Sequence, residues 1–146
     1  MRDRYFLESD KALMTFEFVS DGLKGSIPLT IQYSLTNRRN VYNLGFGAID
    51  QDSGIIDDTV IINNGDTQKI LSTVASSVYA FIDKHPGASV LAKGSTPART
   101  RLYRMGITLN LSEIQKDFEV YGFSEGKWHV FKVKESYEAF LVKRKK

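Results

Sequence analysis

Apolar and polar residues alternate in the first third of the chain. Residues 13–20, 26–35 and 41–49 place apolar side chains at every second position, which is the spacing of a strand with one buried face. A β-branched stretch at residues 55–62 continues the series. Because short polar loops separate these stretches, they predict an antiparallel meander.

Residues 66–84 have the spacing of a helix instead. Asp66 and Thr67 suit its first position, and Pro86 follows its last turn. Apolar residues recur three and four positions apart through the segment, at Ile70, Leu71, Val74, Ala75, Val78, Phe81 and Ile82. This broad stripe predicts a long helix that lies across the inner face of the meander and contributes much of the core.

A second, shorter helix follows a short strand at residues 88–92. Thr96 is a favourable N-cap, and Pro97 suits the first helical position, where no backbone N–H is needed. We expect this helix to end at about Met105, with Gly106 in the left-handed position after its last turn.

The C-terminal part of the chain predicts one more helical turn and then strands. Ser112–Gln115 has the spacing of a capping box. Residues 118–123 and 127–134 flank the turn sequence Ser124-Glu125-Gly126, which predicts a hairpin. Residues 137–142 predict a last strand.

We expect the element order β-β-β-β-β-α-β-α-β-β-β, with about five strands before the long helix, which is an α+β fold. We expect a single domain over residues 1–146, with a short basic tail at 143–146. Its sheet is curved, mainly antiparallel and about seven or eight strands wide, and it packs on one long and one or two short helices.

Composition narrows the chemistry that is open to the chain. It has no cysteine, which excludes disulfides, thiolate metal sites and a cysteine nucleophile and favours a reducing compartment. The first residues lack the apolar core of a secretory signal, and no stretch approaches the ~20 apolar residues of a membrane span. We therefore expect a cytoplasmic protein that does not enter a membrane. A net charge of +3 is only a weak argument for nucleic acid.

The segment Lys93–Arg104 concentrates hydroxyl groups and cations where a strand leads into a helix. Backbone N–H groups, the positive end of the helix dipole and the cations can converge there on one anion, and phosphate is the natural ligand. The residues that we predict to bind it are Lys93, Ser95, Thr96, Arg99, Arg101, Tyr103 and Arg104.

The same segment predicts how the second helix is oriented. Ala98, Leu102 and Met105 lie at i, i+4 and i+7 and are expected to face the core. The arginines and the ring of Tyr103 would then share an exposed surface.

Simpler explanations of these residues remain open. Hydroxyl residues before a proline begin many helices that bind no ligand, and arginines on a short helix often pair with acids. The glycine spacing is not that of a Walker A phosphate loop. Aspartates are also concentrated nearby, at Asp50, Asp52, Asp57, Asp58 and Asp66. We interpret them as turn and capping residues, with Asp57 or Asp58 pointing inward to pair with an arginine of the short helix, and we expect no metal and no cofactor.

The sequence leaves the catalytic residues, if any, unknown. His85 reads as a helix C-terminal residue, and His129 lies on the predicted hairpin. Neither has a nucleophile or an acid at close spacing. A ribonuclease needs only one histidine or tyrosine for proton transfer beside arginines that hold the phosphate, so His129 and Tyr103 are the candidates.

Aromatic residues in the predicted strands suit either a core or a surface on which nucleic-acid bases stack. They are Tyr33, Tyr42, Phe46, Tyr121, Phe123, Trp128 and Phe131, with Lys127, Lys132 and Lys134 beside the last of them.

Several stretches that together span most of the chain carry a resemblance: Tyr42–Gly47, Gly54–Asp58, Asn64–Thr67, Val74–Val78 and Lys93–Tyr103. They resemble a family of small bacterial proteins of unknown function. The resemblance implies one intact domain and brings no activity, substrate or catalytic residue. The element order is also similar in outline to single-strand-binding folds of the whirly and Pur type, which concerns the fold and not the function.

Three functions remain as hypotheses. The first is a nucleic-acid or phosphate-binding module that uses the arginine-rich short helix. The second is a small ribonuclease of the toxin–antitoxin kind. The third is a protein-interaction or structural domain without a ligand, including a homo-oligomer, which is favoured if the arginines pair with Asp57, Asp58 or Asp66.

Overall fold

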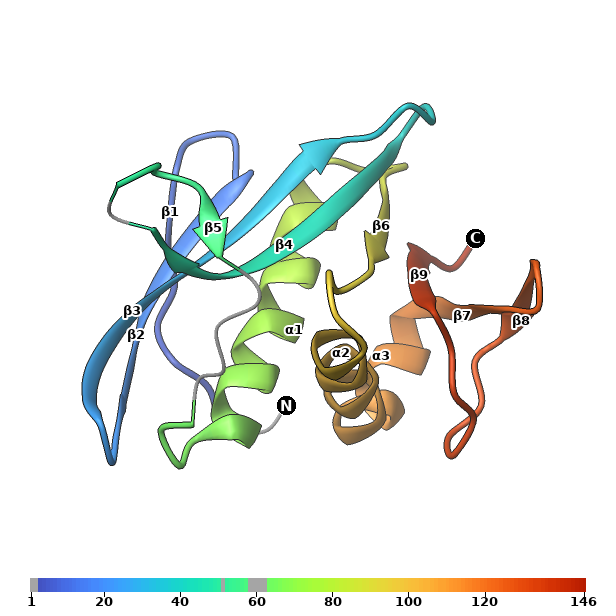
Figure 1. Ribbon diagram of the computed structural model, residues 1–146. Helices are drawn as coiled ribbons and strands as arrows, with labels where there is room; N and C mark the ends of the chain where they lie inside the picture. Colours follow the sequence, from blue (N-terminus) through green and yellow to red (C-terminus); the bar gives the residue numbers. More distant parts are fainter. Residues whose placement is uncertain (1–2, 51, 58–62) are drawn as a thin grey trace.

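The computed structural model describes residues 3–50, 52–57 and 63–146. They form a mixed sheet that does not close, with its helices against one face (Figure 1). The strands lie in the order β1-β2-β3-β4-β6-β9-β7-β8, and β5 pairs with β4 beside this path. The α+β class is confirmed, and one parallel pairing, β4 with β6, interrupts the antiparallel sheet.

The bounds of the elements are as follows. The first five strands are β1 Glu8–Ser9, β2 Thr15–Gly22, β3 Gly25–Leu35, β4 Val41–Ile49 and β5 Ile56–Asp57. The helices are α1 Thr67–Lys84, α2 Pro97–Leu109 and α3 Leu111–Asp117. The remaining strands are β6 Ser89–Ala92, β7 Phe118–Ser124, β8 Lys127–Val130 and β9 Ala139–Arg144.

The meander follows the alternation of the sequence. Phe18 of β2 lies opposite Leu29 of β3, and both are buried on the face that meets the helices. The turn between these strands comes slightly later than Asp21-Gly22, because Gly25 takes the left-handed conformation and Gly22 still pairs with it. Of the predicted strand at residues 55–62, the structure describes β5, and residues 58–62 lie outside its described residues.

Helix α1 crosses the concave face of the meander, as its apolar stripe predicts (Figure 1). Its ring of Phe81 stacks on Tyr33 at 4.2 Å between centroids. Asp66 precedes the helix but makes no side-chain capping bond. Its carboxylate instead accepts hydrogen bonds from Tyr5 and Ser20, so it joins the N-terminal segment and β2 to the start of α1.

The second half of the sheet is built around β9, which lies between β6 and β7. The predicted hairpin of β7 and β8 is present, and Glu125 and Gly126 both have positive φ, as a two-residue turn of this kind requires. Its second strand ends at Val130 rather than at residue 134. The expected basic tail is partly strand, because β9 runs to Arg144, whose guanidinium lies 5.2 Å from the ring centre of Phe118.

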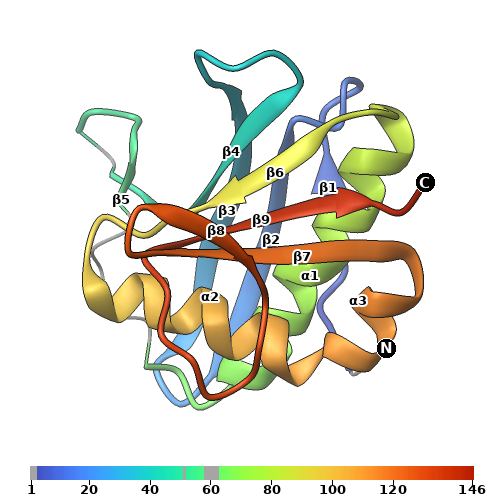
Figure 2. The same cartoon turned by 90° about the vertical axis from the view of Figure 1, so that its right-hand side faces the viewer.

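Two expectations about helix ends are wrong. Helix α2 continues through Gly106 to Leu109, because Gly106 is the point where α2 packs closely on Leu71 of α1. Helix α3 starts at Leu111 after Asn110, so Ser112 is not its N-cap. Figure 2 shows α2 and α3 following one another beneath β7 and β9. Among the described residues, no helix has the length and apolar character needed to cross a membrane.

Candidate anion-binding hollow

The loop from β6 to α2 folds tightly onto the first turn of the helix. Thr96 is the N-cap, and its hydroxyl accepts a 3.1 Å hydrogen bond from the backbone N–H of Arg99. The hydroxyl of Thr100 accepts another, also 3.1 Å, from the N–H of Gly94. A Cβ on Gly94 would lie 2.5 Å from the nitrogen of Thr100, so only glycine allows this approach.

This arrangement uses most of the N–H groups at the start of α2. Pro97 has none, and that of Arg99 is bound by the cap. A ligand here would therefore be held mainly by side chains, with the helix dipole as a weaker contribution.

An open hollow of about 420 Å³ lies beside this loop. One wall is the loop and α2, and the other is the short segment that leads into β9. The residues that line it are Lys93, Gly94, Ser95, Thr96, Pro97, Thr100, Arg101, Arg104, Ser136, Tyr137 and Glu138. Five of the seven residues predicted to bind an anion therefore border one space.

The cations of the hollow are Lys93, Arg101 and Arg104. Lys93 and Arg101 are exposed, and among the described residues their side chains form no ion pair or hydrogen bond. Arg104 is half-buried and donates a 3.1 Å hydrogen bond to the backbone oxygen of Glu135, and no acid among the described residues forms an ion pair with it. Three positive charges thus face a space that solvent can enter.

The opposite wall was not foreseen from the sequence. Gly122 of β7 lets the ring of Tyr137 lie against the strand, where a Cβ would come within 2.3 Å of the ring. The Tyr137 hydroxyl accepts a 3.1 Å hydrogen bond from the N–H of Lys132. The N–H of Glu138 donates a 2.7 Å bond to the oxygen of Phe123. The only sequence signal was an isolated glycine within a strand pattern, which marks a close approach.

The expected position of Arg99 and Tyr103 on an exposed flank is wrong, because both are buried in the core. Arg99 donates a 2.9 Å hydrogen bond from Nη1 to the oxygen of Phe46. The buried face of α2 is consequently Arg99, Tyr103, Gly106 and Ile107. The residues expected to face the core lie elsewhere: Ala98 and Met105 are exposed and Leu102 is half-buried.

A second feature, on the other face of the sheet, is an aromatic surface formed by Tyr121, Phe123 and Trp128. The strand register places Phe123 beside Trp128, with ring centroids 5.1 Å apart, on the face opposite the helices. Trp128 is 41% exposed. Of the other aromatics considered above, Tyr33, Phe46 and Phe131 are buried in the core, and Tyr42 packs against it.

Charged groups flank this aromatic surface. Lys143 Nζ lies 5.4 Å from the ring centre of Tyr121 and 3.7 Å from a carboxylate oxygen of Glu119. The Tyr121 hydroxyl donates a hydrogen bond to the same carboxylate, which raises the pKa of Tyr121. Lys127 is exposed on β8. The main-chain hydrogen bond between Glu138 and Phe123 brings the aromatic surface and the hollow close together, on opposite faces of the sheet.

The two candidates for proton transfer do not border the hollow. Tyr103 is buried beneath α2, and His129 is exposed on β8, where Nε2 lies 3.2 Å from the oxygen of Ser124. His85 closes α1 as predicted, with its ring against the oxygen of Ala12.

The aspartates that the structure describes, Asp50, Asp52, Asp57 and Asp66, are not gathered into a metal site. Among the residues that the structure describes, no group of three or more histidines or acids is close enough to hold a metal ion. Asp66 has Tyr5 and Ser20 as partners rather than an arginine. Asp57 is half-buried, and Asp58 lies outside the described residues, so the expected pairing of one of them with an arginine stays a prediction.

Comparison with known proteins identifies the family. A family described as of unknown function, DUF6934, matches residues 1–145. No curated protein and no solved structure gives a significant match. The resemblance to a family without an established activity is confirmed, and, because the match covers nearly the whole sequence, the chain belongs to the family of unknown function DUF6934.

Proposed function

We propose that the chain is a nucleic-acid-binding module whose hollow holds a backbone phosphate. The observation that carries the proposal is the set of cations Lys93, Arg101 and Arg104 around one open space, with no acid paired to any of them among the described residues. The hydroxyls of Ser95, Thr96 and Ser136 add hydrogen-bonding groups to the same walls. Phosphate combines the charge and the acceptors that such a set recognises.

The aromatic surface favours single-stranded nucleic acid over free phosphate. Trp128 and Phe123 present ring faces on which unpaired bases can stack, and such stacking contributes about 1–3 kcal/mol per base. Phe123 and Glu138 of the hollow are joined by a main-chain hydrogen bond, so the aromatic surface and the hollow are close together on opposite faces of the sheet, and a strand that binds both must pass over the end of the sheet. In a duplex the base faces are already stacked on one another, so the aromatic surface does not increase the affinity for duplexes.

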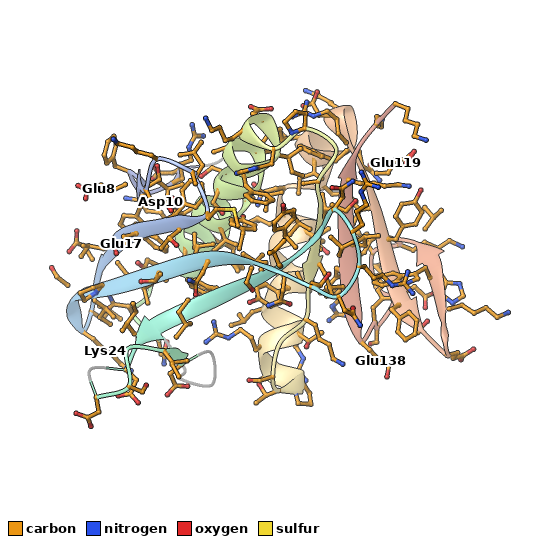
Figure 3. All side chains as sticks on the ribbon, turned by 90° about the horizontal axis from the view of Figure 1, so that it is seen from above. Glu8, Asp10, Glu17, Lys24, Glu119 and Glu138 are labelled. Carbon is orange, nitrogen blue, oxygen red and sulfur yellow. The ribbon has the colours of Figure 1, made fainter. Side chains whose placement is uncertain are left out.

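The test is fluorescence anisotropy with labelled single-stranded and duplex oligonucleotides over a range of salt concentrations. Wild-type protein is compared with the triple variant Lys93→Ala, Arg101→Ala, Arg104→Ala. A matched control, Lys11→Ala, Lys24→Ala, Arg39→Ala, removes three exposed cations at other places on the surface. Figure 3 shows Lys24 far from Glu138, at the other end of the sheet.

We expect the hollow variant to lose most of its single-strand binding and the control to keep it. Each neutralised phosphate contributes about 0.7 to the slope of log affinity against log salt for single strands, so loss of the site for one phosphate should lower that slope by about 0.7. Equal binding by the two triple variants would overturn the proposal.

The other two hypotheses have less support. A ribonuclease that acts at the hollow with Tyr103 or His129 as its proton-transfer group has less support, because neither residue borders the hollow. Running the anisotropy samples on a denaturing gel tests this directly, since shortened RNA would restore the ribonuclease hypothesis. A partner protein or a second copy of the chain stays a prediction, which the absence of any oligonucleotide binding would favour.

A further inference from the structure

Glu138 is the one carboxylate among the residues that line the hollow. It is exposed, and Figure 3 shows its side chain directed away from the strands. The ion pairs between described residues involve Asp3, Glu119 and Asp83, so none of the neighbouring cations is paired with Glu138. Its own backbone N–H is held by Phe123, which fixes the position from which the side chain extends.

A carboxylate in this position is unfavourable for a ligand that consists of phosphate alone. It repels the phosphate and lowers the net charge of the hollow from three positive charges to two. An ionised carboxylate can only accept hydrogen bonds. The ligand that suits the whole hollow therefore carries a hydrogen-bond donor beside its phosphate.

The sugar of RNA has this combination of groups. Its 2′-hydroxyl is a donor that lies next to the backbone phosphate, and it is the group that distinguishes RNA from DNA. An acidic side chain that holds a ribose hydroxyl while other groups hold the phosphate is an arrangement that nucleotide sites use. A volume of about 420 Å³ is enough for one nucleotide, because pockets for ligands of that size start at about 300 Å³.

We propose that the hollow binds a ribonucleotide unit of single-stranded RNA, with the phosphate on Lys93, Arg101 and Arg104 and the 2′-hydroxyl donating to Glu138. The inference rests on the proposed function and makes it more specific. It assigns to Glu138 the selection of RNA over DNA. The cations supply affinity for either nucleic acid.

The experiment compares three labelled oligomers of equal length: oligo-rU, oligo-dU and oligo-2′-O-methyl-U. All have the same base, and the 2′-O-methyl strand keeps an RNA-like sugar shape while lacking the donor. We expect wild-type protein to bind oligo-rU about tenfold more tightly than either of the others, which is the size of one hydrogen bond to a charged group.

The variant Glu138→Ala should lower affinity for oligo-rU to that for oligo-dU and leave oligo-dU binding unchanged or slightly tighter. Glu135→Ala is the matched control, because it removes an exposed acid of the same segment that does not line the hollow. Thermal unfolding of each variant shows whether the fold is intact.

The outcomes separate the two proposals. Equal binding of all three oligomers, lost when the three cations are removed, would overturn the role of Glu138 and leave the nucleic-acid function intact. Tight binding of oligo-2′-O-methyl-U would also overturn it, because the preference would then come from sugar shape. Binding of none of the oligomers would overturn both proposals.

Discussion

Arg99 donates a 2.9 Å hydrogen bond to the backbone oxygen of Phe46, and its guanidinium lies 5.1 Å from the centre of the Phe46 ring. A cation on α2 is thereby fixed inside the core against β4. The contact sets the rotation of α2 about its axis, and this rotation turns Arg101 and Arg104 towards the hollow.

The first prediction concerns the cost of removing this cation. Arg99→Met keeps the volume but leaves the oxygen of Phe46 buried without its donor, and we expect it to lower the free energy of unfolding by about 2–3 kcal/mol. Arg101→Met, on the exposed face, should change it by less than about 0.5 kcal/mol. Urea unfolding monitored by circular dichroism measures both. Similar midpoints for the two variants would show that Arg99 does not hold the helix.

The loop before α2 gives a second prediction. Gly94→Ala would place a Cβ 2.5 Å from the backbone nitrogen of Thr100, so the loop must move off the helix. We expect a loss of about 1–3 kcal/mol in stability together with weaker oligonucleotide binding. Gly45→Ala is the control, because its Cβ would meet only the oxygen of Gln32, at 3.6 Å. If Gly94→Ala unfolds and binds like Gly45→Ala, the tight loop is not needed for the hollow.

The glycine inside α2 should behave in the opposite way. A Cβ on Gly106 would lie 3.4 Å from Cβ of Leu71, an ordinary contact, and it would border a small apolar cavity of about 60 Å³ between the helices and the sheet. Gly106→Ala should therefore raise the free energy of unfolding by about 0.5–1 kcal/mol, since alanine favours a helix interior. Thermal unfolding tests this. A lower melting temperature would mean that α1 and α2 cannot accommodate even a methyl group.

Tyr33 predicts how stability depends on pH. Its hydroxyl is buried and lies 2.7 Å from that of Ser77, and burial raises the pKa of Tyr33 far above that of a free tyrosine. Above about pH 10 the unfolded chain loses this proton while the folded chain keeps it, so stability falls as pH rises, by up to about 1.4 kcal/mol per pH unit. The free energy of unfolding of the Tyr33→Phe variant should fall less steeply over the same pH range. Parallel curves of stability against pH for the variant and the wild-type protein would contradict the prediction.

Trp128 offers a direct optical test of the aromatic surface. It is the single tryptophan of the chain, so selectively excited tryptophan fluorescence reports on this surface alone. We expect single-stranded oligonucleotides to quench it and duplexes of the same length to leave it nearly unchanged. Trp128→Ala should weaken single-strand binding about tenfold, from the loss of one stacked base. Binding without quenching would place the nucleic acid elsewhere.

Local patterns predicted much of the fold. Alternation gave β2, β3 and β4, and helical spacing gave α1 within a residue or two of its observed ends. These elements were predictable because their buried faces follow a simple period in sequence. The order of elements was sufficient to place the fold in the α+β class, since the early strands have no helices between them.

The orientation of α2 was not predictable in this way. Charge suggested that Arg99 points to solvent, whereas the oxygen of Phe46, more than fifty positions earlier in the sequence, holds it in the core. The sequence pattern also predicted that the helix ends before Gly106. A glycine that ends a helix and a glycine that lets two helices approach closely look alike in sequence.

One wall of the hollow was predictable because its residues are neighbours in sequence, whereas the other wall was not. Lys93, Arg101 and Arg104 are close together in sequence, so one segment revealed them. Glu138 joins them only because β9 lies beside β6, and sheet order is a property of the whole fold. A residue that arrives by long-range pairing leaves no local pattern.

The parallel ladder between β4 and β6, the one such ladder among the described strands, also bears on how the chain folds. Val41 pairs with Ser89 across all of β5 and α1, and the ladder contains only four residue pairs. These few contacts offset only a small part of the entropy that is lost when so long a loop is closed. Such pairings are therefore slow to form. We expect each antiparallel half of the sheet to assemble early and the junction between β4 and β6 to form in the rate-limiting step. The hollow, whose two walls both belong to the later half, would take shape without waiting for that junction.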